Sequence, residues 1–206
     1  MKVNLDIMEF VERNILKRYN AFDEAHNIDH AMRVIKASIE LAENLGANVD
    51  MAYVVAAYHD LGLEKERATH HLESGKILKA DKRLEKWFDA QQIEIMKQAV
   101  EDHRASLSRM PRSIYGKIVA EADRDLNPQT VFLRTVQYGK HHYPEMSKEE
   151  HWNRFVEHMQ KKYSTAGYIH MWIPGSKNEQ HLRTLRGIID DKAELRKHFE
   201  WIWSSI

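Results

Sequence analysis

The sequence predicts an all-α protein, and three observations carry this prediction. Apolar residues recur at three- and four-residue steps along most of the chain, which is the spacing of one face of an α-helix. No segment shows a convincing alternation of apolar and polar residues of the kind a half-buried strand requires. There is also no internal repeat and no low-complexity linker. The short apolar segment "YIHMWIPGS" ends in a Pro-Gly turn and therefore adds no strand.

The most regular helical pattern runs from residue 28 to residue 45. Charged residues occupy the opposite stripe, so one face is expected to be buried and the other exposed. Gly46 follows as a plausible C-terminal stop. The apolar stripe consists of Ile28, Met32, Ile35, Ile39, Ala42 and Leu45.

The following segments continue the helical pattern. Asp50 is placed to cap "MAYVVAAYHD", which is apolar all round and is therefore expected at the centre of the domain. Gly62 ends that segment, and Thr69 could cap a helix through "HHLESGKILKA". Further helical patterns cover about residues 85–103, 112–124, 129–142, 148–163 and 178–203.

Length and composition bound the organisation of the chain. Its 206 residues suffice for one domain with a sizeable core and an extension. Aromatic residues and histidines become more frequent after Asn127–Pro128. We therefore expect a domain over residues 1–126, with its core motifs in 26–126, and a helical extension over 127–206 packed on the same domain.

The charge balance argues against polyanionic partners. Lysines and arginines number 31, as do aspartates and glutamates, so neither a nucleic-acid polymer nor a membrane surface is expected as a partner. No segment approaches the roughly 18 apolar residues of a membrane span, and the N-terminus lacks a signal-peptide core. A cytoplasmic protein is the expectation. Without cysteine, any metal must be bound by histidine and carboxylate ligands.

Six polar residues interrupt apolar helical faces and are expected to point inward or into a cleft. Such a group costs free energy to bury unless it is paired. A hydrogen-bonded ion pair or a metal ion would satisfy it. Singly, an inward histidine is more often a satisfied core residue than a ligand. The six residues are His30, His59, Asp60, His71, His103 and Asp123.

Three of the segments that carry these residues resemble the HD-domain superfamily of metal-dependent phosphohydrolases. They are "NIDHAMRV", "AAYHDLG" and "VAEADRDL", and the resemblance extends over roughly residues 20–126. It implies a helical HD-domain bundle in which His30, His59, Asp60 and Asp123 bind a metal. The resemblance is specific for fold and metal binding, and unspecific for substrate.

Two further segments, "HHLESG" and "VEDHR", resemble those that hold a second metal in some HD proteins. The His–x3–Gly spacing favours His71 over His70, with His103 as the other ligand and Asp60 as a bridge. Alternatively, His71 caps or packs, and His103 lines the cleft as a hydrogen-bond donor. One or two divalent ions are thus implied, and the ligand set suits Mn, Fe, Co, Ni, Zn or Mg.

Such a site would hydrolyse a small phosphoester or a nucleotide through attack of a metal-bound hydroxide. Lys65, Arg67 and Arg104, with Arg124, are candidates for phosphate contacts, and Glu64 for a general base. For each, a surface ion pair is the ordinary alternative. Whether the enzyme is a phosphomonoesterase, a phosphodiesterase or a pyrophosphohydrolase stays open.

Two other functions fit the same pattern. One is an HD-fold di-iron oxygenase, and the other is a non-catalytic, nucleotide-binding regulatory module. The interpretation also allows a homodimer. The extension contains aromatic residues and histidines that either pack its helices or cover the cleft and stack on a base. They are Tyr138, His141, His142, Tyr143, Tyr163, Tyr168, His170 and Trp172.

Overall fold

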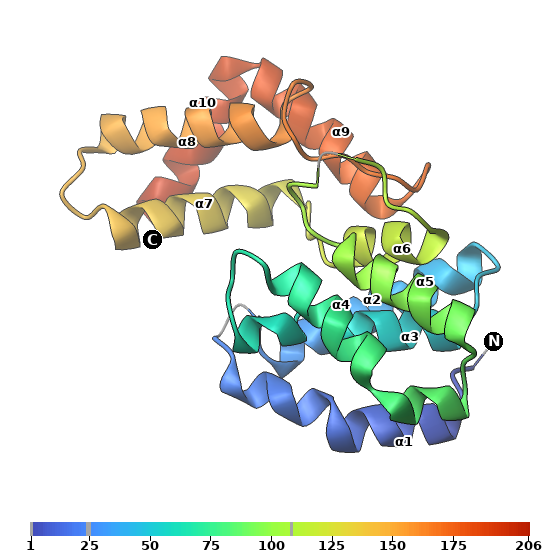
Figure 1. Ribbon diagram of the computed structural model, residues 1–206. Helices are drawn as coiled ribbons and strands as arrows, with labels where there is room; N and C mark the ends of the chain where they lie inside the picture. Colours follow the sequence, from blue (N-terminus) through green and yellow to red (C-terminus); the bar gives the residue numbers. More distant parts are fainter. Residues whose placement is uncertain (1, 24–25, 108) are drawn as a thin grey trace. The chain divides into compact units, whose positions relative to one another are not determined.

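The structure is a computed structural model that describes residues 2–23, 26–107 and 109–206. Within these residues the regular elements are all helices, which confirms the predicted all-α class. The chain divides into two compact units, Met1–Asp123 and Arg124–Ile206 (Figure 1). The expected packing of the extension on the first domain stays a prediction.

The first unit surrounds helix α3 (Val49–Tyr58), whose residues other than Asp50 are all buried. Helices α1, α2, α4, α5 and α6 all contact α3, which explains why its sequence is apolar all round (Figure 1). The short 3-10 helices η1, η3 and η4 connect longer ones in the described part of this unit. The bounds are α1 (Leu5–Asn14), η1 (Leu16–Ala21), α2 (Ile28–Asn44), η3 (Leu61–Glu64), α4 (His70–Ala80), η4 (Lys82–Lys86), α5 (Ala90–Glu101) and α6 (Ile114–Ala122).

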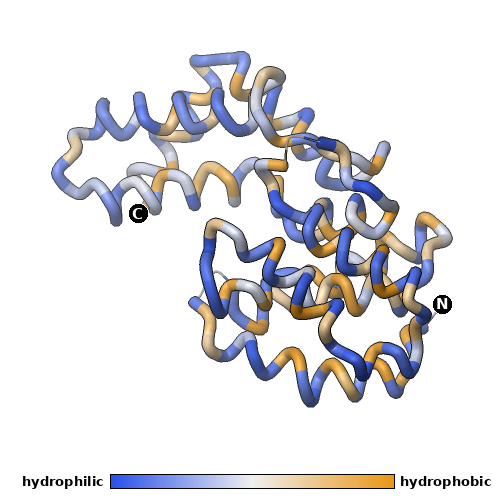
Figure 2. The backbone as a smooth tube through the Cα atoms, in the orientation of Figure 1, coloured by the Kyte–Doolittle hydropathy of each residue, from blue (hydrophilic) through white to orange (hydrophobic). Residues whose placement is uncertain are grey.

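The helix ends follow local sequence chemistry, with differences from expectation. Gly46 follows α2 with φ of 65°, a left-handed conformation that glycine adopts without strain. The cap of α3 is Asn48 and not Asp50, because the Asn48 side chain accepts hydrogen bonds from the Asp50 and Met51 amides. The amphipathic pattern is visible along α1, where hydrophobic and hydrophilic residues alternate within successive turns (Figure 2).

The helix expected over residues 85–103 is shorter than predicted. Residues 82–86 form η4, and α5 starts only after Asp89. The Asp89 side chain accepts from the Gln92 amide while the Gln92 side chain accepts from the Asp89 amide, a capping box that fixes this start.

The second unit consists of α7 (Pro128–His142), α8 (Lys148–Tyr163), α9 (Lys177–Asp190) and α10 (Lys192–Ser205). Phe132, Phe155 and Phe199 are fully buried in its core, with successive ring centroids 5.6 and 5.5 Å apart. The single helix predicted over residues 178–203 is wrong. Asp191 divides it, since the Asp191 side chain caps α10 through the Ala193 and Glu194 amides.

The aromatic residues and histidines of the extension do not form one group. Tyr163 is buried, as the packing interpretation expects, whereas Tyr138 and Tyr168 are exposed. In the described part of the chain, no helix combines the length and the apolar character that crossing a membrane would require.

Candidate metal centre

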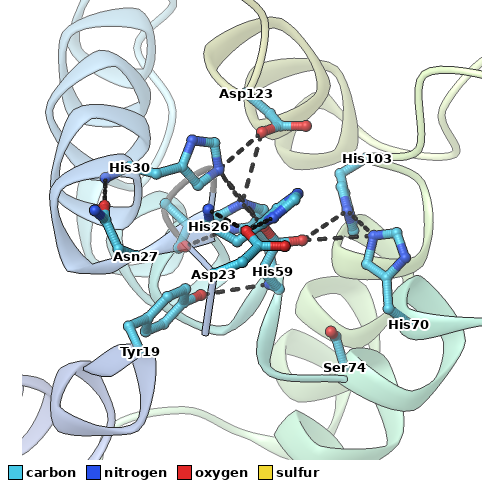
Figure 3. A network of polar contacts seen from close by, with 12 residues as sticks. Tyr19, Asp23, His26, Asn27, His30, His59, His70, Ser74, His103 and Asp123 are labelled. Carbon is cyan, nitrogen blue, oxygen red and sulfur yellow. Dashed lines mark hydrogen bonds and ion pairs between the residues drawn. The ribbon is translucent and has the colours of Figure 1, made fainter. Parts of the chain in front are cut away.

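The centre is built on the turn that ends α3. His59 is the C-terminal cap residue and Asp60 the next residue, and both are buried. The His59 Nδ1–H donates to the Ala56 carbonyl oxygen at 2.7 Å, because a carbonyl can only accept. This bond leaves the Nε2 lone pair of His59 facing the interior of the cluster (Figure 3).

Four side chains meet in a first group, one from α2, one from the end of α6 and two from the α3 turn. His30 belongs to the first turn of α2, which Asn27 caps, and Asp123 follows α6. The His30 Nε2 lies 3.1 Å from the His59 Nε2, 3.2 Å from Asp123 Oδ1 and 3.5 Å from Asp60 Oδ2. Ligand atoms held about 2.0–2.2 Å from one ion are separated by roughly 3–3.5 Å. The separations among His30, His59 and Asp60 suit a single ion, and Asp123 lies beside the two imidazoles.

A second group meets at the other oxygen of Asp60. The His70 Nε2 lies 3.1 Å from the His103 Nε2, and these two nitrogens lie 3.5 and 3.6 Å from Asp60 Oδ1. Asp60 therefore faces one group with each carboxylate oxygen (Figure 3). This arrangement is the one a carboxylate needs to bridge two ions.

The tautomers of the second group indicate a cation. The Nδ1–H of His70 donates to the Arg67 carbonyl at 2.8 Å, and that of His103 donates to the Val100 carbonyl at 2.6 Å. Two neutral rings held in this way direct their Nε2 lone pairs at each other across 3.1 Å. Burial lowers the pKa of His70, which opposes relief by protonation. A bound cation would satisfy both lone pairs at once.

The carboxylates of the centre stay ionised. Burial opposes ionisation of Asp60 and Asp123, but the neighbouring imidazoles outweigh it and hold both pKa values well below the usual range. Conversely, burial opposes protonation of His59, and the two carboxylates overcome it and raise its pKa. A divalent ion would replace the proton on the His59 Nε2, and imidazole and carboxylate are donors that divalent transition metals accept.

The structure corrects the choice of His71. His70 faces Asp60 and His103, whereas the His71 Nδ1 is buried without a hydrogen-bond partner among the described residues. Adjacent residues of a helix diverge by about 100°, so only one of the two can face the centre. The spacing to Gly75 was misleading because Gly75 serves helix packing, and a Cβ there would lie 2.8 Å from Glu101 Cγ of α5.

Comparisons with known proteins agree with this geometry. A family model described as "HD domain" matches residues 27–127. Residues 27–127 are an HD domain. An uncharacterized protein of Clostridium beijerinckii is 32% identical over 98 residues, which cover 43% of this chain and 62% of that protein. The alignment thus spans less than two thirds of that relative's length.

A solved structure resembles the whole chain. It is the crystal structure of a predicted HD superfamily hydrolase from an uncultured Thermotogales bacterium, with a TM-score of 0.53 and 19% identity. The likeness covers 97% of this chain and 90% of the other. At this identity it concerns the fold alone. The HD domain of this chain lies within its first unit except for the last residues matched.

Gly62, two residues after Asp60, allows the first turn of α4 to pack close to the α3 turn, which brings His70 near Asp60. A Cβ at residue 62 would lie 2.0 Å from the His70 carbonyl oxygen, so only glycine permits this approach. The Gly62 amide also donates to Ser74 Oγ at 2.8 Å. From its sequence neighbours alone, this glycine is predicted only to end the preceding helix.

Asp102, the residue before His103, is buried and ionised. Burial opposes its ionisation, but hydrogen bonds from Arg112 and Arg109 outweigh it and lower its pKa. The Arg109 Nη2 and Arg112 Nη2 lie 2.6 and 2.8 Å from Asp102 Oδ1. These bonds tie the connection between α5 and α6 to the residue preceding His103.

The predicted catalytic residues around the centre have other partners. Both oxygens of Glu64 accept hydrogen bonds from Arg18, at 2.7 and 2.6 Å, which is the surface ion pair named as the alternative to a general base. Lys65 pairs with Glu73 at 2.6 Å, and Arg67 pairs with Asp23 at 3.3 Å. Arg104 donates to the Ala68 carbonyl, and Arg124 belongs to the second unit.

Sequence reasoning missed His26. Its Nδ1 lies 2.6 Å from Asp23 Oδ1, and its ring lies edge-on to that of His30 with centroids 5.9 Å apart (Figure 3). Its side chain is 20% exposed, so a ligand can reach it. The segment "HNIDH" places His26 directly before Asn27, which caps the helix that carries His30.

Proposed function

We propose that the chain is a metal-dependent phosphohydrolase acting on a small phosphoester or a nucleotide. The observation that supports this most strongly is the pair of groups that share Asp60, with the Nε2 lone pairs of His70 and His103 directed at each other. His30, His59, Asp60 and Asp123 would hold one divalent ion. Asp60, His70 and His103 would hold a second.

Divalent ions bound there would polarise a phosphoryl oxygen and acidify a water molecule. The chain's own contribution is orientation. The backbone carbonyls that accept from Nδ1 of His59, His70 and His103 fix which nitrogen of each ring faces inward. Asp60 carries negative charge between the two groups, and burial of His59 and His103 keeps bulk water from competing for them.

The residues at the edge of the centre suit a phosphoester. Arg67 is 71% exposed and lies next to Asp23, so its guanidinium can leave a weak surface pair for a phosphate. The Asp23 carboxylate accepts from the Nδ1–H of His26, so the protonated ring would present its Nε2–H to the leaving oxygen as a general acid. These two roles belong to the proposal.

The first test is metal analysis of the purified protein, with hydrolysis assays on aryl phosphates and nucleotides with Mn²⁺, Fe²⁺, Co²⁺, Ni²⁺, Zn²⁺ or Mg²⁺. Asp60→Ala should lose both metal binding and hydrolysis, because both groups need this carboxylate. Asp81→Asn, a change at a largely buried carboxylate outside the centre, should keep both.

Two outcomes would replace the proposal. Metal-loaded protein that hydrolyses no phosphoester, yet binds a nucleotide unchanged, would indicate a regulatory module. A mixed-valence di-iron spectrum with dioxygen consumption would indicate an oxygenase. Full metal content in Asp60→Ala would contradict the assignment of the centre itself.

A further inference from the structure

The turn that carries His59 and Asp60 is held from outside the matched HD domain. Tyr19 belongs to η1, before the first matched residue at 27, and is fully buried. Its hydroxyl donates to the Ala57 carbonyl oxygen at 3.0 Å and accepts from the Asp60 amide at 3.4 Å (Figure 3). One side chain thus contacts the backbone on both sides of His59.

The Tyr19 hydroxyl takes the place of backbone hydrogen bonds that would continue helix α3. In a continuing helix the Asp60 amide would donate to the carbonyl of Ala56, or of Ala57 in a 3-10 turn. The Ala56 carbonyl accepts from the His59 ring instead, and the Ala57 carbonyl accepts from Tyr19. Asp60 accordingly leaves the helical conformation, with φ of −106° and ψ of 1°.

The conformation of Asp60 decides where both of its oxygens point. Its Oδ2 faces His30 and His59, and its Oδ1 faces His70 and His103. A rotation of the turn would misdirect both oxygens together. The bidentate bond from Arg18 to Glu64 holds η1 at a second point, just beyond the turn.

We propose that Tyr19 is a positioning residue of the metal centre, which sets the direction of the Asp60 carboxylate through its hydroxyl. The inference rests on the proposed function, because it assumes that the centre binds metal. This role would make η1 part of the centre, and we therefore expect residues 27–127 without η1 to bind metal poorly. Removing a hydrogen-bond partner that orients a metal ligand commonly weakens metal affinity by about 10–100-fold.

Tyr19→Phe tests this, because it keeps the buried ring and removes the hydroxyl. The matched control is Tyr58→Phe, which removes a hydroxyl that donates to Asp81 at 2.8 Å from the end of the same helix, away from the centre. The measurements are Mn²⁺ titration of the metal-free protein by calorimetry, the visible spectrum of the Co²⁺ form, and the melting temperature.

Tyr19→Phe should weaken Mn²⁺ binding by about 10–100-fold and change the Co²⁺ spectrum. Tyr58→Phe should lower the melting temperature to a similar extent, with Mn²⁺ affinity within about 2-fold of wild type. Equal Mn²⁺ affinity in wild type and Tyr19→Phe would overturn the inference, and so would equal weakening in both variants.

Two further results keep the inference separate from the proposed function. Wild-type protein that binds no divalent ion would refute the proposed function and remove the basis of the inference. If Tyr19→Phe does not fold, Arg18→Gln releases the other attachment of η1 and should weaken Mn²⁺ binding several-fold. Unchanged Mn²⁺ affinity in Arg18→Gln would then overturn the inference.

Discussion

Replacing Gly62 with alanine should displace His70 from the metal centre. The added Cβ would lie 2.0 Å from the His70 carbonyl oxygen, 2.8 Å from the His70 carbonyl carbon and 2.7 Å from the Ser74 amide nitrogen. Because Cβ contacts under 3.0 Å essentially never occur, the first turn of α4 must move by at least about 1 Å. The obstructing atoms are backbone, so no side-chain rotation can relieve them.

This displacement has two calculable effects. Overpacking of this kind costs about 1–3 kcal/mol, which corresponds to a fall in melting temperature of roughly 4 °C per kcal/mol. Metal–ligand distances tolerate only about 0.2 Å, so a shift of about 1 Å removes His70 as a ligand. The group of His30, His59 and Asp123 lies on other elements and should keep its ion.

The assay combines thermal unfolding with metal titration of metal-free protein. Gly62→Ala should bind one Mn²⁺ with near wild-type affinity and the second at least about 10-fold more weakly. Gly187→Ala is the control, because a Cβ there meets nothing within 4 Å and alanine favours a helix by about 1 kcal/mol. A Gly62→Ala protein with wild-type melting temperature and two wild-type binding events would refute the reasoning.

Two other predictions test the centre and the surrounding fold. His70→Ala should lose the second ion while His71→Ala retains it, as judged by metal content after dialysis, and the reverse pattern would restore the sequence-based choice. Burial opposes ionisation of Asp81, but hydrogen bonds from Arg83 and Tyr58 outweigh it and lower its pKa. The ionised carboxylate therefore stabilises the fold fully above its unfolded pKa of about 4, and this stabilisation is lost as pH falls through its lower folded pKa. Asp81→Asn should cost about 1–3 kcal/mol at pH 7 in urea unfolding and progressively less below pH 4, and a gap that widens on acidification would contradict this.

Residues that face inward from long helices were the easiest to find in the sequence. His30 and His103 continue apolar stripes, and a polar residue on such a stripe is conspicuous because burial demands a partner. The position of His59 and Asp60 after an apolar segment gave the same kind of signal. The structure brings these residues and Asp123 together, and their role as ligands stays a prediction.

Residues at helix starts and in short connections were harder to find. His70 and His71 begin α4, where no preceding turn defines a face, so their sequence neighbours could not distinguish them. Asp191 was overlooked for a similar reason, since an aspartate inside an amphipathic pattern looks like part of the exposed face until its cap bonds are seen.

The sequence by itself determined the helical class, the central position of α3 and the resemblance to HD domains, because hydrophobic periodicity and short motifs are local properties of the chain. Only the tertiary structure decided which residues meet across long separations. The close approach of Gly62 to the His70 backbone places His70 beside Asp60. Arg18 donates hydrogen bonds to Glu64, and the Tyr19 hydroxyl bonds to the backbone of the His59–Asp60 turn. Each depends on how helices pack, which spacing within one segment does not encode.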